Sequence, residues 1–291
     1  MLMLLGGHPL FAYAIVGLGA AAYSPAKYGI LTELLPPSQL VKANAWMEGL
    51  TVASIILGVV LGGQLIMPWL SGWMLALDVP GLALPLRTPT DMAIAVLVGI
   101  YTIAAGFNLY IPRTGARLRR LPRRAMWLLV PDFRRCNRRL WGDRLGQISL
   151  ATTTLMWGVS GNMRYIVLAW AAVALGYDTS AGATLVGVVA LGMALGAVLA
   201  SLRVRLERAT IVLPLGLVLG GVLMSMAWVR HAGGAVPLLA LLGVLGGYIV
   251  VPMNALLQHR GHLLVGAGRS IAVQNFNEQA CILVMGLAYS F

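Results

Sequence analysis

Charged residues are scarce in this sequence of 291 residues: only 10% are Asp, Glu, Lys or Arg. Acidic residues are the rarest, with 9 Asp and Glu against 21 Lys and Arg. Hydrophobic residues make up 59% of the chain, and the mean hydropathy is +0.84, far outside the range of soluble domains. The composition therefore predicts a protein whose solvent is the lipid bilayer.

Several chemistries lack the residues that they need. Cys136 and Cys281 are expected at different depths of the membrane, so no disulfide is expected. The sequence has no GxxxxGK[ST] loop to cradle phosphates and no Ser/His/Asp or Cys/His set. His259 and His262 stand three residues apart but have no further ligand residues nearby. We therefore expect no enzymatic activity, no metal site and no cofactor.

Eight apolar stretches are long enough to cross about 30 Å of hydrocarbon as helices. They predict an all-α polytopic membrane protein. The opening MLMLLGGHPLFAYAIVG lacks the basic start of a signal peptide, and we interpret it as the interior of a longer protein. The predicted spans are 9–31, 40–66, 91–112, 147–175, 182–202, 209–229, 236–258 and 267–290.

Arginine residues crowd into the connection 113–146, and the net charge of +12 comes largely from it. Without an aromatic-interleaved surface, this basic run does not predict a nucleic-acid partner. Alternate connections hold the remaining loop cations, as the positive-inside rule requires. The rule assigns 32–39, 113–146, 203–208 and 259–266 to the cytoplasm, and 67–90, 176–181 and 230–235 to the outside.

The connection 113–146 also divides the chain into domains. We expect one helix bundle in 1–112, a basic cytoplasmic linker in 113–146 and a second bundle in 147–291. Within the linker, LPRRAMWLLVPDFRR interleaves apolar residues with arginines, a pattern suited to lying on an anionic leaflet. The alternative is a solvated basic loop that only sets the topology.

A weak internal repeat supports two bundles. GAAAYSP, ending at Pro25, and GGYIVVP, ending at Pro252, each lead to a predicted cytoplasmic loop. NAWME (Asn44 to Glu48) is similarly matched by QNFNE (Gln274 to Glu278). Parallel repeats of about six spans build one large class of transporters. On that plan this chain holds spans four to eleven of twelve.

One arginine, Arg164, lies near the middle of a predicted span. A cation in hydrocarbon costs at least about 2.5–3.5 kcal/mol, so it normally faces a cavity or a partner. We expect Arg164 and the nearby Asn162 to bind a polar ligand inside the membrane; a structural ion pair is the alternative.

Further polar residues fall within predicted spans. Lys27 follows the helix-loosening Pro25, and it either faces inward to bind an anionic headgroup or snorkels to the interface. Asn44 and Glu48 share a helix face, as do Gln274 and Glu278. These pairs predict latches between the bundles, or merely caps and partners for nearby loop cations.

Small residues recur on two spans, at Gly58, Gly62 and Gly63 and at Gly187, Gly192 and Gly196. We interpret both sets as sites of close helix packing.

Three segments carry a family resemblance. GLGAAAYSPAKYGILTELLPPSQLVKANAWMEGLTVASIILGVVLGG (Gly17 to Gly63) closely resembles the earlier half of the lysophospholipid transporters of the major facilitator superfamily. GGYIVVPMNALLQHRG and VGAGRSIAVQNFNE (Gly246 to Glu278) resemble the later half of that family. LMWGVSGNMRYIVLAW resembles the family segment that holds a membrane arginine. The family's first three helices and last helix have no counterpart here.

The resemblance implies a major-facilitator-type two-bundle architecture with about eight of twelve helices. It implies a multi-pass protein of the bacterial inner membrane that flips lysophosphatidylethanolamine and lysophosphatidylglycerol from the periplasmic to the cytoplasmic leaflet. An acyl-carrier-protein-dependent acyltransferase would then re-esterify them. Spans four, seven and ten line the central cavity in this superfamily, which implies substrate-binding roles for Lys27, Tyr28, Asn162, Arg164 and Asn254.

Two rival functions remain at this point. A proton-coupled carrier of a drug or sugar would use Glu48 and Glu278 as proton sites. A non-transporting scaffold would use the basic linker to recruit an acyltransferase or anionic lipid. In either case we expect a monomer embedded among membrane lipids.

Overall fold

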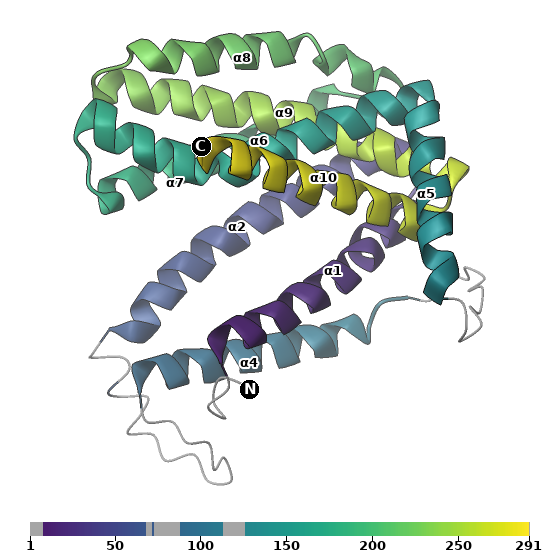
Figure 1. Ribbon diagram of the computed structural model, residues 1–291, viewed down its shortest axis with the longest axis horizontal. Coiled ribbons are helices and arrows are strands. Elements are labelled where there is room, and N and C mark those ends of the chain that lie inside the picture. The colour runs from purple at the N-terminus through teal and green to yellow at the C-terminus, as the bar shows by residue number, and fades with distance from the viewer. Residues whose placement is uncertain (1–7, 68–71, 73–87, 113–125, 291) are drawn as a thin grey trace. The chain divides into compact units, whose positions relative to one another are not determined.

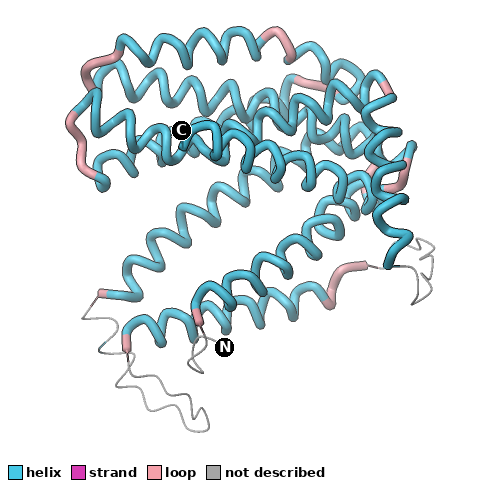
Figure 2. The backbone as a smooth tube through the Cα atoms, in the orientation of Figure 1, coloured by secondary structure: helices cyan, strands magenta, loops and turns pink. Residues whose placement is uncertain are grey.

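The computed structural model describes residues 8–67, 72, 88–112 and 126–290. Those residues form helices joined by short connections, with no strand among them (Figure 2). This arrangement confirms the predicted all-helical class. It also agrees with the physics of the bilayer core, where a helix satisfies every backbone group within its own segment.

The helices lie close to the predicted spans, with differences at their ends (Figure 1). Six of the segments that the structure describes are long and apolar enough to cross a membrane. The first and last predicted spans are helices of 26 and 24 residues that are not among those six. In the last span, Arg269 and five Asn, Gln and Glu residues between 274 and 279 lower the hydropathy. The helices are α1 (Pro9–Leu34), α2 (Leu40–Ile66), α4 (Pro89–Asn108), α5 (Met126–Gly142), α6 (Arg144–Leu175), α7 (Thr179–Arg203), α8 (Leu215–Ser225), α9 (Ala232–Leu264) and α10 (Ala267–Ser290), with short 3₁₀ helices at Pro37–Gln39, Leu206–Val212 and Met226–Trp228.

Several helix ends follow local sequence signals. Asp143 and Asp178 cap α6 and α7 by accepting hydrogen bonds from the backbone N–H groups of Gly146 and Ala181, both at 2.8 Å. Gly176 ends α6 with a φ of 66°, a left-handed conformation that glycine adopts without steric cost. These caps fix where each span stops and the chain reverses.

The chain divides into two compact units. The first comprises Met1–Tyr23 and Ala53–Ala116; the second comprises Ser24–Val52 and Arg117–Phe291. The beginning of α2 thus belongs with the later helices, since Leu40, Val41 and Ala45 share a buried core with α7 and α9. These units cut across the boundary between the two expected bundles, and the division at 112 and 147 stays a prediction.

Helix α9 is the centre of the second unit. It packs against α6, α7, α8 and α10, and its residues from Ile249 to Gln258 are all buried. Large apolar side chains instead face outward around it, among them Val173 (87% exposed) on α6 and Leu217 (83%) on α8. An apolar exterior of this kind needs lipid around it.

Glycines allow the closest of these contacts. A Cβ on Gly192 or Gly196 of α7 would overlap the carbonyl oxygen of Ala240 or Val244 on α9. The predicted packing role is therefore confirmed for these two. It is wrong for Gly187, which faces open space, and Gly58 and Gly62 also have no neighbouring atom within 4 Å where a Cβ would lie. Spacing alone does not reveal which glycines on a helix meet a neighbour.

Residues 126–142 of the predicted linker form helix α5 rather than a solvated loop, and 144–146 already belong to α6. Helix α5 runs across the ends of α6, α9 and α10 (Figure 1). Cys136 and Leu140 are buried against Leu150, Leu257 and Val273. The Phe133 ring meets the Phe276 ring edge to face, with centroids 5.0 Å apart. The solvated-loop alternative is thus wrong for this segment; residues 113–125 lie outside the described residues.

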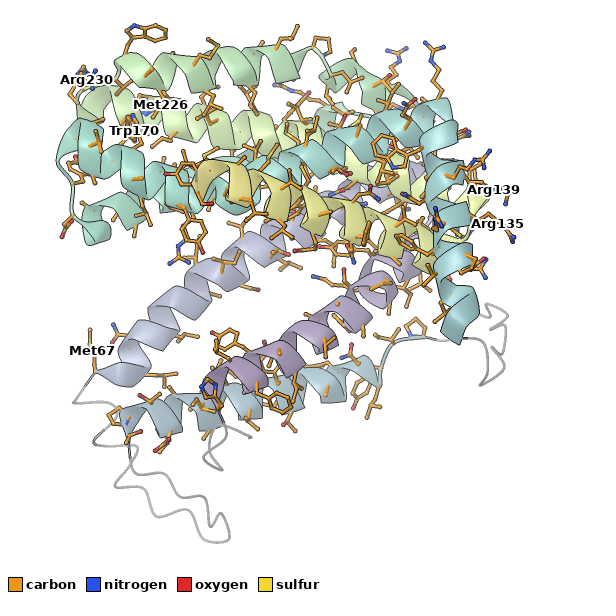
Figure 3. The ribbon with its side chains drawn as sticks, in the orientation of Figure 1. Met67, Arg135, Arg139, Trp170, Met226 and Arg230 are labelled. Atoms are coloured by element: carbon orange, nitrogen blue, oxygen red, sulfur yellow. The ribbon has the colours of Figure 1, made fainter. Side chains whose placement is uncertain are left out.

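The four connections assigned to the cytoplasm converge at one end of the second unit. A cavity of about 250 Å³ lies at this end. Its lining includes one residue that belongs to or adjoins each of the four connections: Ser38, Leu145, Glu207 and Arg260. Arg260 of α9 also donates to both carboxylate oxygens of Asp143, at 2.5 and 3.1 Å. Figure 3 labels Trp170, Met226 and Arg230 at the other end of this unit. The connections 176–181 and 230–235 thus lie together at the end opposite the four, as predicted. Most of 67–90 lies outside the described residues, and which end is cytoplasmic stays a prediction.

Candidate functional site

A buried polar cluster is the most unusual feature of the second unit. Three helices each contribute two polar side chains one turn apart, and all six are at most 8% exposed. Polar groups buried in a membrane protein are costly unless they are hydrogen-bonded. The six residues are Asn44 and Glu48 on α2, Asn254 and Gln258 on α9, and Gln274 and Glu278 on α10. We call them the polar cluster.

Asn44 and Gln258 form a reciprocal amide pair. The Asn44 Nδ2 donates to Gln258 Oε1 at 2.9 Å, and the Gln258 Nε2 donates to Asn44 Oδ1 at 2.8 Å. The second Asn44 donor reaches the Leu40 carbonyl of its own helix at 2.9 Å. Gln258 was not among the predicted site residues, although its i, i+4 spacing from Asn254 is the signal that singled out the other two pairs.

Gln274 joins the other half of the cluster. Its Nε2 donates to Asn254 Oδ1 at 2.9 Å and to Glu278 Oε1 at 2.7 Å. Its own Oε1 is buried and finds no hydrogen-bond partner among the described residues. Asn44 and Gln274 therefore both bond to α9, and neither reaches a loop cation. The predicted latch residues lie together, with α9 as the element that joins them.

Lys27 and Tyr28, predicted to bind substrate, lie beside the polar cluster. The Lys27 Nζ is 5.1 Å from the centre of the Tyr28 ring. The Lys27 charge acts on Glu48, and the charges of Glu48 and Glu278 both act on Tyr28. The Lys27 ammonium group thus has the Glu48 carboxyl group as a nearby opposite charge. Such an arrangement keeps a cation inside the protein by giving it nearby opposite charge.

Arg164 lies elsewhere, at an apolar cavity of about 180 Å³ within the second unit. The cavity is lined from α6, α7, α8 and α9, with Ser160 as its other polar side chain. The Arg164 side chain is exposed, and it makes no hydrogen bond or ion pair with any residue that the structure describes. The structural ion pair considered for Arg164 is therefore not formed among these residues.

Asn162 does not share the Arg164 cavity. Residues two apart on an α-helix differ in direction by about 200°, so they occupy nearly opposite faces. Asn162 is buried and donates to the Ile282 carbonyl of α10 at 3.1 Å and to the Gly158 carbonyl of its own helix at 2.9 Å. It joins α6 to α10. The predicted substrate-binding set is thus divided among three places.

Two further polar contacts attach neighbouring elements to α10. Asn275 donates to the Ser24 hydroxyl of α1 at 2.8 Å, and Asn277 donates to the side-chain Oδ1 of Asn137 on α5 at 3.1 Å. The first bond joins α10 to α1. Asn277 had not been singled out.

The family model of the Major Facilitator Superfamily matches residues 1–277 of this sequence. The chain belongs to that superfamily. Among individual proteins, it is 39% identical over 291 residues to a protein named lysophospholipid transporter LplT from Pectobacterium carotovorum subsp. carotovorum, and 40% identical over 286 residues to the protein of that name from Yersinia pestis. No solved structure matches this chain.

These alignments cover 100% and 98% of this superfamily member, but only 66% and 65% of the two relatives. The chain therefore spans about two thirds of their length. The resemblance stated from the sequence motifs is confirmed, as is a multi-pass membrane protein of the major facilitator type. Its relatives are named as transporters, which points to transport rather than catalysis.

Proposed function

We propose that this protein flips lysophospholipids across the bacterial inner membrane, from the periplasmic to the cytoplasmic leaflet. The observation that carries the proposal is similarity along the whole chain, at 39% and 40% identity, to proteins named lysophospholipid transporters. The expected substrates are lysophosphatidylethanolamine and lysophosphatidylglycerol. On this proposal an acyl-carrier-protein-dependent acyltransferase re-esterifies the product.

The Arg164 cavity suits such a substrate. A lysophospholipid carries a phosphate and a single acyl chain, so its carrier needs a cation beside an apolar surface. Arg164 offers a planar guanidinium that holds phosphate through two parallel hydrogen bonds. Met156, Met163 and Met193 are among the apolar side chains of the same cavity, and methionine adapts readily to chains of different shape.

The polar cluster has a different role in this proposal. It lies near the end of the second unit where the predicted cytoplasmic connections converge. Breaking the amide pair between Asn44 and Gln258 would separate α2 from α9 there. We infer that the cluster holds this end closed during one half of the transport cycle, with Glu48 and Glu278 as part of the latch.

The test is uptake of labelled lysophosphatidylethanolamine by spheroplasts that express the chain. Arg164→Ala is expected to abolish uptake with normal membrane insertion, and Arg164→Lys to restore it partly, because a point charge replaces a planar fork. Arg203→Ala is the matched control, since Arg203 is exposed at the end of α7 and does not line the cavity. Normal uptake by well-inserted Arg164→Ala would remove the headgroup role.

A proton-coupled carrier is the second candidate, and the burial of Glu48 and Glu278 in one cluster favours it. Membrane carriers often place ionisable groups inside the protein as proton relays. Dissipating the proton gradient with an uncoupler distinguishes the two candidates. Lysophospholipid flipping is expected to persist, whereas proton-coupled uptake would collapse.

The scaffold hypothesis needs a test that leaves the fold intact. Deleting 117–139 would remove Cys136 and Phe133 from their contacts with the bundle, so the deletion would disturb the fold itself. Replacing the exposed Arg134 and Arg138 with Gln leaves those contacts intact. A scaffold that recruits an acyltransferase through this basic surface would then lose function, and a transporter would keep its lipid uptake.

A further inference from the structure

A second cationic cavity lies on α5, outside the polar cluster and away from Arg164. Its volume is about 330 Å³. One wall is α5, which contributes Arg135 and Arg139 one turn apart. The other wall is the connection between α9 and α10, together with Arg269 in the first turn of α10. Figure 3 labels Arg135 and Arg139 at this end of the bundle. We call this the α5 cavity.

Positive charge predominates in the α5 cavity. Among the residues that the structure describes, three guanidinium groups and one carboxylate, that of Asp132, line it. That carboxylate pairs with Arg269 at 3.3 Å, and Arg139 donates to the Leu264 carbonyl through a long bond of 3.4 Å. Arg135 makes no hydrogen bond or ion pair with the residues that the structure covers. The cavity therefore has guanidinium donors to spare for an anion.

Exposed apolar side chains surround this charge. Leu263 lines the cavity and is 61% exposed, and Val130 on the preceding turn of α5 is 62% exposed. Phe276, which meets Phe133, is also exposed. A soluble anion would gain nothing from these apolar groups. An amphipathic helix that combines arginines with exposed apolar residues instead lies at the boundary between headgroups and acyl chains.

We propose that the α5 cavity binds the phosphate-bearing headgroup of an anionic diacyl phospholipid in the leaflet that α5 faces. Arg135 and Arg139 hold the phosphate oxygens, and the apolar residues beside them contact the start of the acyl chains. This resident lipid is distinct from the transported lysophospholipid, and its binding does not depend on the proposed function. The bound lipid would hold one side of α5 at the membrane surface. The packing of Cys136 and Leu140 already holds the helix against the bundle.

Native mass spectrometry of the detergent-solubilised chain tests the proposal, with phosphatidylglycerol and zwitterionic phosphatidylcholine as probes. The chain is expected to retain phosphatidylglycerol preferentially. Arg135→Gln/Arg139→Gln is expected to weaken that binding at least about tenfold, because both guanidinium groups that hold the phosphate are lost. Arg134→Gln/Arg138→Gln is the matched control, since it removes equal charge from the same helix outside the cavity.

A third variant keeps the test valid if the double variant unfolds. Asp132→Asn removes the Asp132 carboxylate from the cavity and frees Arg269, so it is expected to strengthen phosphatidylglycerol binding by a few fold. Equal losses in both arginine double variants would mean diffuse attraction to the basic helix and would overturn the proposal. Displacement of the lipid by millimolar inorganic phosphate would also overturn it, because the cavity would then recognise a soluble anion.

Discussion

Asn44 on α2 and Gln258 on α9 exchange two hydrogen bonds across a sequence separation of 214 residues. The two amides are 3% and 2% exposed, so each satisfies the other where water cannot. Removing one side chain leaves buried polar atoms of the other without their partner, which costs about 1–3 kcal/mol. This pair therefore makes the attachment of α2 to α9 dependent on a matched set of donors and acceptors.

The first prediction concerns that pair. Asn44→Leu and Gln258→Leu are each expected to destabilise the protein in detergent by about 1–3 kcal/mol. The double variant Asn44→Leu/Gln258→Leu is expected to cost less than the sum of the single changes, because neither amide is then stranded. Thermal unfolding of the four proteins measures the coupling. Strictly additive losses would mean that the two side chains do not act as a pair.

The second prediction uses two glycines of the same helix. Gly196→Ala is expected to destabilise the protein by about 3 kcal/mol or to prevent its insertion, because the new methyl group would overlap the Val244 backbone, which cannot move aside. Gly187→Ala is the control: it faces open space and should change stability by no more than about 1 kcal/mol. Similar behaviour of both variants would contradict the packing of α7 on α9.

The third prediction is that stability depends on pH through Asp143, the N-cap of α6. The hydrogen bonds from Arg260 hold the pKa of Asp143 below its usual range. A lowered carboxyl pKa adds stability that is present above the unfolded-state pKa of about 3.9 and is lost as the pH falls through the folded-state pKa. Asp143→Asn keeps a good helix cap but removes the charge, so it is expected to cost about 2 kcal/mol at neutral pH. The difference in melting temperature from the unsubstituted protein should shrink below about pH 4. A constant difference across that range would exclude the ion pair as its cause.

The fourth prediction concerns the thiol of Cys136. Burial, with a smaller contribution from the Asp132 charge, raises its pKa despite the arginines nearby. Because thiol reagents attack the thiolate, maleimide labelling of a Cys281→Ser variant is expected to be slow at neutral pH and to quicken as the pH rises. Unfolding in detergent should remove the protection. Rapid labelling of the folded protein at neutral pH would place α5 away from the bundle.

Much of the fold could be predicted from short stretches of sequence. Apolar runs of about 20 residues predicted the spans from 40–66 to 236–258. Each run is long enough to cross the hydrocarbon core as a helix without help from other segments. The motif around Pro25 and Lys27 indicated the major facilitator superfamily, to which the chain belongs. Even the separation of Asn162 from Arg164 was accessible, because helix geometry places residues two apart on nearly opposite faces.

Other features depended on which helices meet. Gly187 and Gly196 lie on the same helix, α7, but only Gly196 faces α9. The basic segment around Phe133 suited either a solvated loop or a helix, and the buried positions of Cys136 and Leu140 decided between them. The sequence by itself determined the membrane environment, the helices and the family, because these follow from local composition and motifs. Only the tertiary structure decided that Asn44 pairs with Gln258 and that Gln274 joins Asn254 to Glu278, because a buried hydrogen bond requires a partner that helix packing brings from a distant part of the chain.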